Sequence, residues 1–208
     1  MTGTSVKICG LTTPEAVQAA SDAEYNGFIF YEKSVRNISP DEAAKLKIHT
    51  KAKTVAVVVN PSDDFLNKIV TEFNPDYFQL HGDESPKRIS EIKNKFKKPI
   101  IKAFNISASG DLDEVTTYQD SADMFLFDAK APSGFPGGNG IVFDWKILAG
   151  KTFSKPWFIS GGLNIENIAK ALQISGATML DISSGLESAP GVKNPQLIRK
   201  FIDKVRNI

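Results

Sequence analysis

The chain has 208 residues, and 25 Lys and Arg residues against 24 Asp and Glu residues leave a formal net charge of +1. A near-neutral chain exerts no bulk electrostatic pull on nucleic acid or on an anionic membrane, so we expect neither partner. Its apolar runs are far shorter than the roughly 20 residues that a membrane span needs. The one cysteine, Cys9, excludes an internal disulfide, and we expect no secretory signal, because the first apolar run begins only a few residues into the chain. These features predict a cytoplasmic protein.

The sequence repeats one pattern, in which a short apolar run and a polar turn precede an amphipathic stretch of helix length. Ser39 and Glu42, like Thr12 and Glu15, have the spacing of a helix capping box. Most of the apolar runs are continuous rather than alternating, which is typical of parallel strands covered on both faces. There are eight of them: Val6–Cys9, Gly27–Phe30, Thr54–Val59, Asp76–Leu80, Pro99–Phe104, Asp123–Phe127, Pro156–Ser160 and Ala177–Ile182.

Eight strands that alternate with helices predict an α/β fold of the (β/α)8 TIM-barrel type, with residues 1–208 forming one barrel domain. The alternative is a doubly wound open sheet, which usually has a glycine-rich nucleotide-binding turn after its first strand. Here the first turn reads Cys9-Gly10-Leu11-Thr12 and lacks that pattern. We therefore favour the closed barrel, whose active site lies at the C-terminal ends of its strands.

That location brings four polar residues, remote in sequence, to one mouth of the barrel: Cys9, Arg36, His81 and Asp128. Asp128 ends a very apolar run, where desolvation disfavours the charged form and prepares a general acid. The alternative is a carboxylate that pairs with Lys130 or caps a loop. For Cys9 and Arg36 the alternatives are a thiol packed in the core and an ordinary surface arginine.

Two glycine-containing loops predict a phosphate site. In this fold the loops after strands 7 and 8 often bind phosphate through backbone N–H groups. The seventh run is followed by Gly161 and Gly162, and the eighth by Ser183, Ser184 and Gly185. Two ordinary turns are the alternative.

We expect no metal, because two histidines and one cysteine do not supply a cluster of ligands. The segment Lys130–Gly140 contains four glycines but lacks the phosphate-binding P-loop pattern. We interpret it as a lid that excludes water from the mouth when closed, with a long surface loop as the alternative.

These residues resemble the phosphoribosylanthranilate isomerase family, and the resemblance runs from Lys7 to the final helix. It rests on Lys7-Ile8-Cys9-Gly10, Ser34-Val35-Arg36, Gln79-Leu80-His81-Gly82, Phe127-Asp128, the run from Gly137 to Trp145, Ser160-Gly161-Gly162-Leu163-Asn164, and the run from Asp181 to Lys193. The first and last of these motifs are specific when they occur together.

The resemblance implies a cofactor-free Amadori rearrangement of N-(5-phosphoribosyl)anthranilate in tryptophan biosynthesis, with Cys9 as general base and Asp128 as general acid. It further implies that Arg36 holds the anthranilate carboxylate or orients the substrate, and that His81 and Asp181 support substrate binding. The ligand would be a phosphorylated small molecule and the enzyme a monomer or homodimer. Lys7 would favour a Cys9 thiolate, although we expect strand alternation to point Lys7 away from it.

Three positions depart from the family pattern: Val35 where Pro is expected, and Ala129 and Asn139 where Thr is expected. One alternative function is the related barrel isomerase of histidine biosynthesis, which uses a carboxylate at the end of strand 1. Another is a phosphosugar epimerase, or an aldolase with Lys102 as its Schiff-base lysine. The last is a phosphate-ester binding barrel without catalysis, which needs the glycine loops but neither acid nor base.

Overall fold

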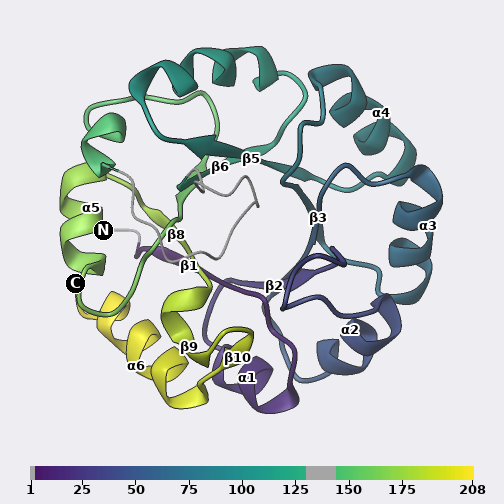
Figure 1. Ribbon diagram of the computed structural model, residues 1–208, viewed down its shortest axis with the longest axis horizontal. Helices are drawn as coiled ribbons and strands as arrows, with labels where there is room; N and C mark the ends of the chain where they lie inside the picture. The colour runs from purple at the N-terminus through teal and green to yellow at the C-terminus, as the bar shows by residue number, and fades with distance from the viewer. Residues whose placement is uncertain (1–2, 130–143) are drawn as a thin grey trace.

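Eight parallel strands close into a barrel in the computed structural model, which describes residues 3–129 and 144–208. Each strand pairs with its neighbours in the chain, and β8 closes the barrel on β1 (Figure 1). The predicted (β/α)8 fold is confirmed. The strands are β1 (Ser5–Cys9), β2 (Tyr25–Ile29), β3 (Lys53–Val58), β4 (Tyr77–Leu80), β5 (Ile100–Ile106), β6 (Met124–Ala129), β7 (Trp157–Ile159) and β8 (Met179–Ile182).

Helices surround the barrel on its outside, as the view along the barrel in Figure 1 shows. None in the described part of the chain has the length and apolar character of a membrane span. The α-helices are α1 (Pro14–Ala19), α2 (Pro40–Lys47), α3 (Asp63–Glu72), α4 (Pro86–Phe96), α5 (Ile168–Ser175) and α6 (Pro195–Arg206).

The sheet separates two apolar cores. The larger packs the outer faces of the strands against the helices and includes the fully buried rings of Phe28, Phe78 and Phe201. Because side chains alternate along a strand, the residues between these outward ones face the barrel axis. They form the inner core of Cys9, Tyr25, Val55, Val57, Ile101, Ala103, Met124, Leu126, Phe158 and Met179.

The helix starts follow the capping signals closely. Ser39 caps α2 in a full capping box with Glu42, as its spacing predicts. The start of α1 differs by one residue, because the side chain of Thr13 rather than Thr12 accepts the capping hydrogen bond, from the backbone N–H of Ala16.

Two of the expected α-helices are 3₁₀ segments instead: η1 (Ser109–Tyr118) after β5 and η2 (Trp145–Leu148) before β7. In η1 the residues that pack inward, Leu112, Val115 and Tyr118, recur every third residue. That spacing matches the three residues per turn of a 3₁₀ helix rather than the 3.6 of an α-helix. The same segment contains Gly110 and two threonines, which have low α-helix propensity.

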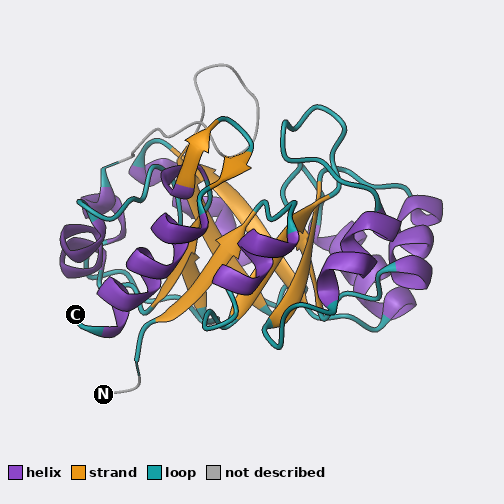
Figure 2. Ribbon diagram, turned by 90° about the horizontal axis from the view of Figure 1, so that it is seen from below, coloured by secondary structure: helices purple, strands orange, loops and turns teal. Residues whose placement is uncertain are grey.

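A small hairpin follows β8 and was not predicted. The short 3₁₀ turn η3 (Ser184–Leu186) leads into β9 (Glu187–Ala189), which pairs antiparallel with β10 (Val192–Lys193). Figure 2 shows this hairpin standing at one end of the barrel. It brings Glu187 and Lys193 to the mouth.

Candidate active site

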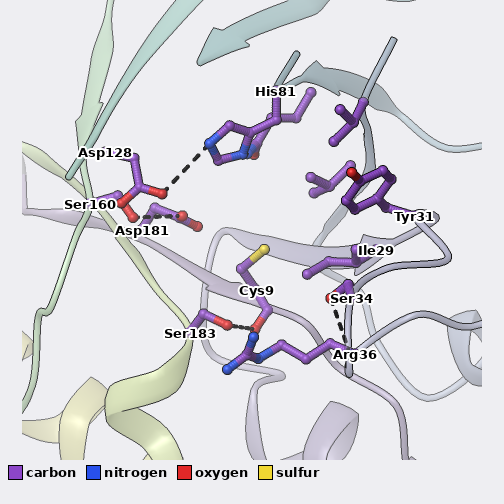
Figure 3. A pocket seen from close by; sticks show the side chains of 13 residues that line it. Cys9, Ile29, Tyr31, Ser34, Arg36, His81, Asp128, Ser160, Asp181 and Ser183 are labelled. Carbon is purple, nitrogen blue, oxygen red and sulfur yellow. Dashed lines mark hydrogen bonds and ion pairs between the residues drawn. The ribbon is translucent and has the colours of Figure 1, made fainter. Parts of the chain in front are cut away.

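A cavity opens at the C-terminal ends of the strands, where the sequence predicts the site. Figure 3 shows the Cys9 sulfur directed into it, with Asp128 and His81 on one side and Ile29 and Tyr31 on the other. The lining residues are Cys9, Ile29, Tyr31, Ser34, Arg36, Val57, Val59, Gln79, His81, Asp128, Ser160, Asp181 and Ser183. All five residues predicted as catalytic or substrate-binding are among them.

Asp128 is a buried carboxyl group, 5% exposed, at the penultimate position of β6. Burial raises its pKa from 3.8 to about 7, and the nearby charge of Asp181 acts in the same direction. The backbone N–H of Ala129 donates to its Oδ1 at 2.8 Å and partly offsets this rise. A carboxyl group with a pKa near neutrality can both hold and give up a proton at neutral pH.

His81 follows β4 and faces Asp128, with 3.6 Å between its Nε2 and Asp128 Oδ2. Burial lowers the pKa of the ring to about 4, so His81 is neutral at pH 7. Its Nδ1 lies 3.2 Å from Nε2 of Gln79, a pocket residue to which the sequence analysis gave no role.

Cys9 is the last residue of β1 and is 5% exposed. Burial raises the pKa of its thiol, while Lys7 and Lys193 act against this rise. Lys7 does not point away from Cys9 as expected. Residues two apart in a strand share a face, so both side chains enter the barrel, where the Lys7 ammonium group lies close enough to the thiol to lower its pKa.

Asp181 in β8 lies beside Asp128 and Cys9, and both of its carboxylate oxygens are hydrogen-bonded within the protein. Its Oδ1 accepts a hydrogen bond from Lys7 Nζ at 2.7 Å, and its Oδ2 accepts one from the Ser160 hydroxyl at 3.1 Å. Lys7 is completely buried, so this ion pair is held in the low-dielectric interior below the cavity.

Arg36 is held by a residue of the hairpin. Its Nε and one terminal nitrogen donate to the two carboxylate oxygens of Glu187 at 2.6 and 2.8 Å, a bidentate pair. Lys193 also pairs with Glu187 and reaches the Ser183 hydroxyl, which in turn donates to the Cys9 carbonyl at 3.0 Å. Burial opposes the ionisation of Glu187, but Arg36 and Lys193 lower its pKa to about 2. Glu187 and Lys193 lie within the family motif, but sequence analysis gave neither a role.

The two predicted phosphate loops lie next to each other. Gly161 and Gly162 have positive φ angles of 84° and 63°, which favour glycine. A Cβ on Gly161 would come within 2.7 Å of Ala129, and a Cβ on Gly185 would overlap the Leu163 carbonyl oxygen. The glycines therefore allow the end of β7 to pack against β6 and against the loop after β8, where Ser183 and Ser184 begin η3.

Lys102 is outside the barrel rather than in the cavity. It pairs with Glu84 at 2.9 Å and donates to the Gly82 carbonyl, on the outer side of β5. This placement removes the aldolase alternative, which needs a lysine at the reacting centre.

Of the three departures from the family pattern, two fall on described residues. Val35 is 68% exposed. Its backbone lies against the hairpin, because a Cβ on Gly191 would be 2.8 Å from the Val35 carbonyl oxygen. Ala129 is buried against Gly161. Asn139 and the interpreted lid Lys130–Gly140 lie outside the described residues. Within the described ranges, no group of His, Cys, Asp and Glu is arranged to hold a metal ion.

A closed (β/α)8 barrel with a buried acid and a thiol at its mouth, beside two glycine loops, defines the class of barrel enzymes that move protons on a small ligand. The family described as N-(5'-phosphoribosyl)anthranilate (PRA) isomerase matches residues 6–204. The N-(5'-phosphoribosyl)anthranilate isomerase of Brucella canis is 50% identical over 206 residues, covering 96% of this chain and 93% of that protein. The chain belongs to this family of isomerases.

Solved structures agree. The phosphoribosyl anthranilate isomerase of Thermotoga maritima superposes with a TM-score of 0.87 at 30% identity, covering 99% of this chain and 100% of that one. A phosphoribosyl anthranilate isomerase in complex with reduced 1-(o-carboxyphenylamino)-1-deoxyribulose 5-phosphate gives 0.81 at 28% identity, with the same coverage. The expected isomerase of tryptophan biosynthesis is confirmed, and the histidine-pathway alternative is not supported.

Proposed function

We propose that Asp128 and Cys9 carry out the isomerisation of N-(5'-phosphoribosyl)anthranilate as general acid and general base. The observation that carries this proposal is a carboxyl group with a pKa raised to about 7 in the same cavity as a thiol whose pKa a buried lysine lowers. An aminoaldose becomes an aminoketose only if one group donates a proton to the sugar ring oxygen and another removes a proton from C2′.

Asp128 performs the first step. Its carboxyl proton passes to the ribose ring oxygen, the bond from that oxygen to C1′ breaks, and the lone pair of the anthranilate nitrogen forms a C1′=N iminium bond. The ring oxygen becomes a hydroxyl group, and Asp128 is left as a carboxylate. A pKa near neutrality suits this role, because the group is protonated often enough to donate and acidic enough to do so readily.

Cys9 performs the second step as a thiolate. It takes the C2′ proton, the electrons of that C–H bond form a C1′=C2′ bond, and the iminium electrons return to nitrogen. The resulting enolamine takes a proton at C1′ and loses one from its 2′-hydroxyl to give the ketone. Lys7 stabilises the thiolate, and Asp181 keeps Lys7 in place.

The remaining pocket residues bind and orient the substrate. The apolar side formed by Ile29, Val57, Val59 and Tyr31 suits the anthranilate ring, and Arg36 holds its carboxylate. The phosphate occupies the paired loops, on the backbone of Gly161, Gly162, Ser183, Ser184 and Gly185. His81 lies beside the Asp128 carboxyl group and supports its role as the acid. Both oxygens of Asp181 are already bonded, so we assign it support of Lys7 rather than substrate contact.

Turnover of freshly generated phosphoribosylanthranilate, followed by the loss of anthranilate fluorescence, tests this assignment. Cys9→Ala and Asp128→Asn should each lower kcat by about 10²–10⁴, or roughly 3–5 kcal/mol of barrier. Asp120→Asn, at an exposed position outside the cavity, is the matched control and should retain wild-type turnover. A folded Asp128→Asn with more than about half of wild-type activity would remove the acid assignment. A wild type that binds the phosphoester without turning it over would favour the binding barrel.

A further inference from the structure

The amide of Gln79 lies against the ring of His81 inside the barrel. The two residues are separated by one position at the end of β4, so both side chains face the interior. Gln79 is 1% exposed, and its Nε2 lies 3.2 Å from His81 Nδ1. In this orientation of the amide its nitrogen faces the ring, and an amide nitrogen is only a donor, so Nδ1 of His81 is the acceptor, while Oε1 of Gln79 has no hydrogen-bond partner among the described residues.

The position of the remaining ring proton follows from this contact. His81 is neutral at pH 7, because burial lowers its pKa to about 4. A neutral imidazole carries one proton, and when Nδ1 accepts a hydrogen bond the proton is on Nε2. Among the described residues, no hydrogen-bond partner is within range of Nε2, and the nearest carboxyl oxygen facing it is Asp128 Oδ2 at 3.6 Å (Figure 3).

We propose that Gln79 is a positioning residue whose amide holds the His81 ring as its Nε2–H tautomer, so that an N–H group faces the Asp128 carboxyl. This inference rests on the proposed role of Asp128 as the acid. Because Nε2 already carries a proton, Asp128 does not lose its own proton to His81, and that proton stays available for the sugar ring oxygen.

The same tautomer helps after the proton has left. The carboxylate that forms on Asp128 faces an N–H donor, and a hydrogen bond to an ionised group is stronger than one to a neutral group. The 3.6 Å separation is longer than a hydrogen bond, so the two groups are close without being bonded, and the interaction strengthens as charge develops on Asp128. The opposite tautomer would present the Nε2 lone pair to Asp128. That lone pair would compete for the proton of Asp128 and would then repel the carboxylate.

The ring nitrogens report the tautomer directly, without any assay of activity. In protein labelled with ¹⁵N at histidine, long-range ¹H–¹⁵N spectra at pH 7 distinguish a protonated nitrogen from an unprotonated one. The chain has two histidines, and His49→Gln removes the other signal, which comes from outside the cavity. We expect His81 with the proton on Nε2. A wild-type spectrum with the proton on Nδ1 overturns the proposal, and this test needs no variant of Gln79 that folds.

Replacing the donor at Gln79 by an acceptor then tests the consequence. In Gln79→Glu the carboxylate draws a proton to Nδ1 of His81, and kcat should fall at least about 10-fold while KM changes less than about 3-fold. Gln18→Glu, which adds the same charge on the exposed face of α1, should match wild type in both values. A Gln79→Glu protein with its proton on Nε2 or with wild-type kcat overturns the proposal. Failure of the proposed function would show differently, as an inactive wild type with the Nε2–H spectrum intact.

Discussion

The ammonium group of Lys7 and the carboxylate of Asp181 form an ion pair inside the barrel, with 2.7 Å between Nζ and Oδ1. A buried ion pair loses much of its attraction to desolvation, so it is weak evidence for stability. Because the pair lies beside Cys9, we infer that it acts on the ionisation of the thiol rather than on stability. Burial raises the pKa of the Cys9 thiol, and Lys7 is the largest influence that lowers it. Lys7 and Cys9 also share the space next to Gly27, where a Cβ would lie 3.1 Å from Nζ and 3.0 Å from Sγ.

Lys7→Met should therefore raise the pKa of Cys9 and slow its reactions. We expect the rate of alkylation by iodoacetamide at pH 7.5 to fall at least about 10-fold, with a parallel fall in kcat/KM. The single variant also leaves the buried charge of Asp181 without its ion-pair partner, which costs about 3–5 kcal/mol of folding free energy.

The double variant Lys7→Met/Asp181→Asn separates the two effects, because it removes both charges. Its urea unfolding midpoint should recover toward wild type, while its alkylation rate recovers only in part, because Asp181 no longer raises the thiol pKa but the larger effect of Lys7 is still missing. A double variant that is alkylated as fast as wild type would show that Lys7 acts only on stability.

The pH dependence of kcat/KM should have two limbs with a plateau between them. The competent form carries its proton on Asp128 and none on Cys9, so the pair holds one proton in total. Below pH 7 the pair gains a second proton and activity falls. Above the raised pKa of Cys9 the pair loses its last proton, and activity falls again. An activity that decreases steadily as pH rises through 7, measured by initial rates, would contradict this account.

Asp128 should make the wild-type protein less stable at high pH. Its pKa is about 7 in the folded chain and 3.8 for the free group. Between these values the folded chain holds a proton that the unfolded chain releases. The free energy of unfolding therefore falls as pH rises from about 4 to about 7, by roughly 3–4 kcal/mol.

Asp128→Asn removes this contribution. In urea unfolding, the free energy of unfolding of the variant should fall less from pH 5 to pH 8 than that of wild type. At pH 8 the variant should be the more stable of the two proteins. Equal pH dependence in both proteins would mean that the carboxyl is not held protonated by burial.

The sequence predicts the barrel well, because most of its strands are continuous apolar runs, and such a run is recognised from the local sequence alone. It also predicts that Cys9 and Asp128 meet, since strand ends in a barrel converge whatever their distance in sequence. The segments η1 and η2 were missed because an apolar repeat of three residues resembles part of an α-helical pattern.

The supporting residues were harder to find. Gln79 and Glu187 act through a contact with one other side chain, and such contacts follow from rotamers and packing rather than from residue type. Lys7 is a different case, because the period of two along β1 already places it on the face of Cys9.

Glu187 should determine how well Arg36 binds the substrate carboxylate. Glu187→Gln keeps the side-chain shape but removes the charge that holds both Arg36 and Lys193. We expect KM to rise about 10-fold with a smaller change in kcat, because a binding contact rather than a proton transfer is disturbed. Glu187→Asp keeps the charge, so its KM in steady-state kinetics should lie between those of Glu187→Gln and wild type. A raised kcat with unchanged KM would place Arg36 outside substrate binding.

The phosphate site is best tested at Gly162 rather than Gly161. A side chain at Gly161 would displace Ala129 and with it the end of β6 that carries Asp128. Gly162 is half-buried, and its φ of 63° is a conformation that Asn and Asp tolerate. Gly162→Asp and Gly162→Asn have nearly the same shape, so their difference isolates one negative charge. KM for the substrate, and the inhibition constant of inorganic phosphate, should be at least about 10-fold higher in the Asp variant, since like charges repel at this range. If the two variants bind phosphate equally well, the anion lies away from this loop.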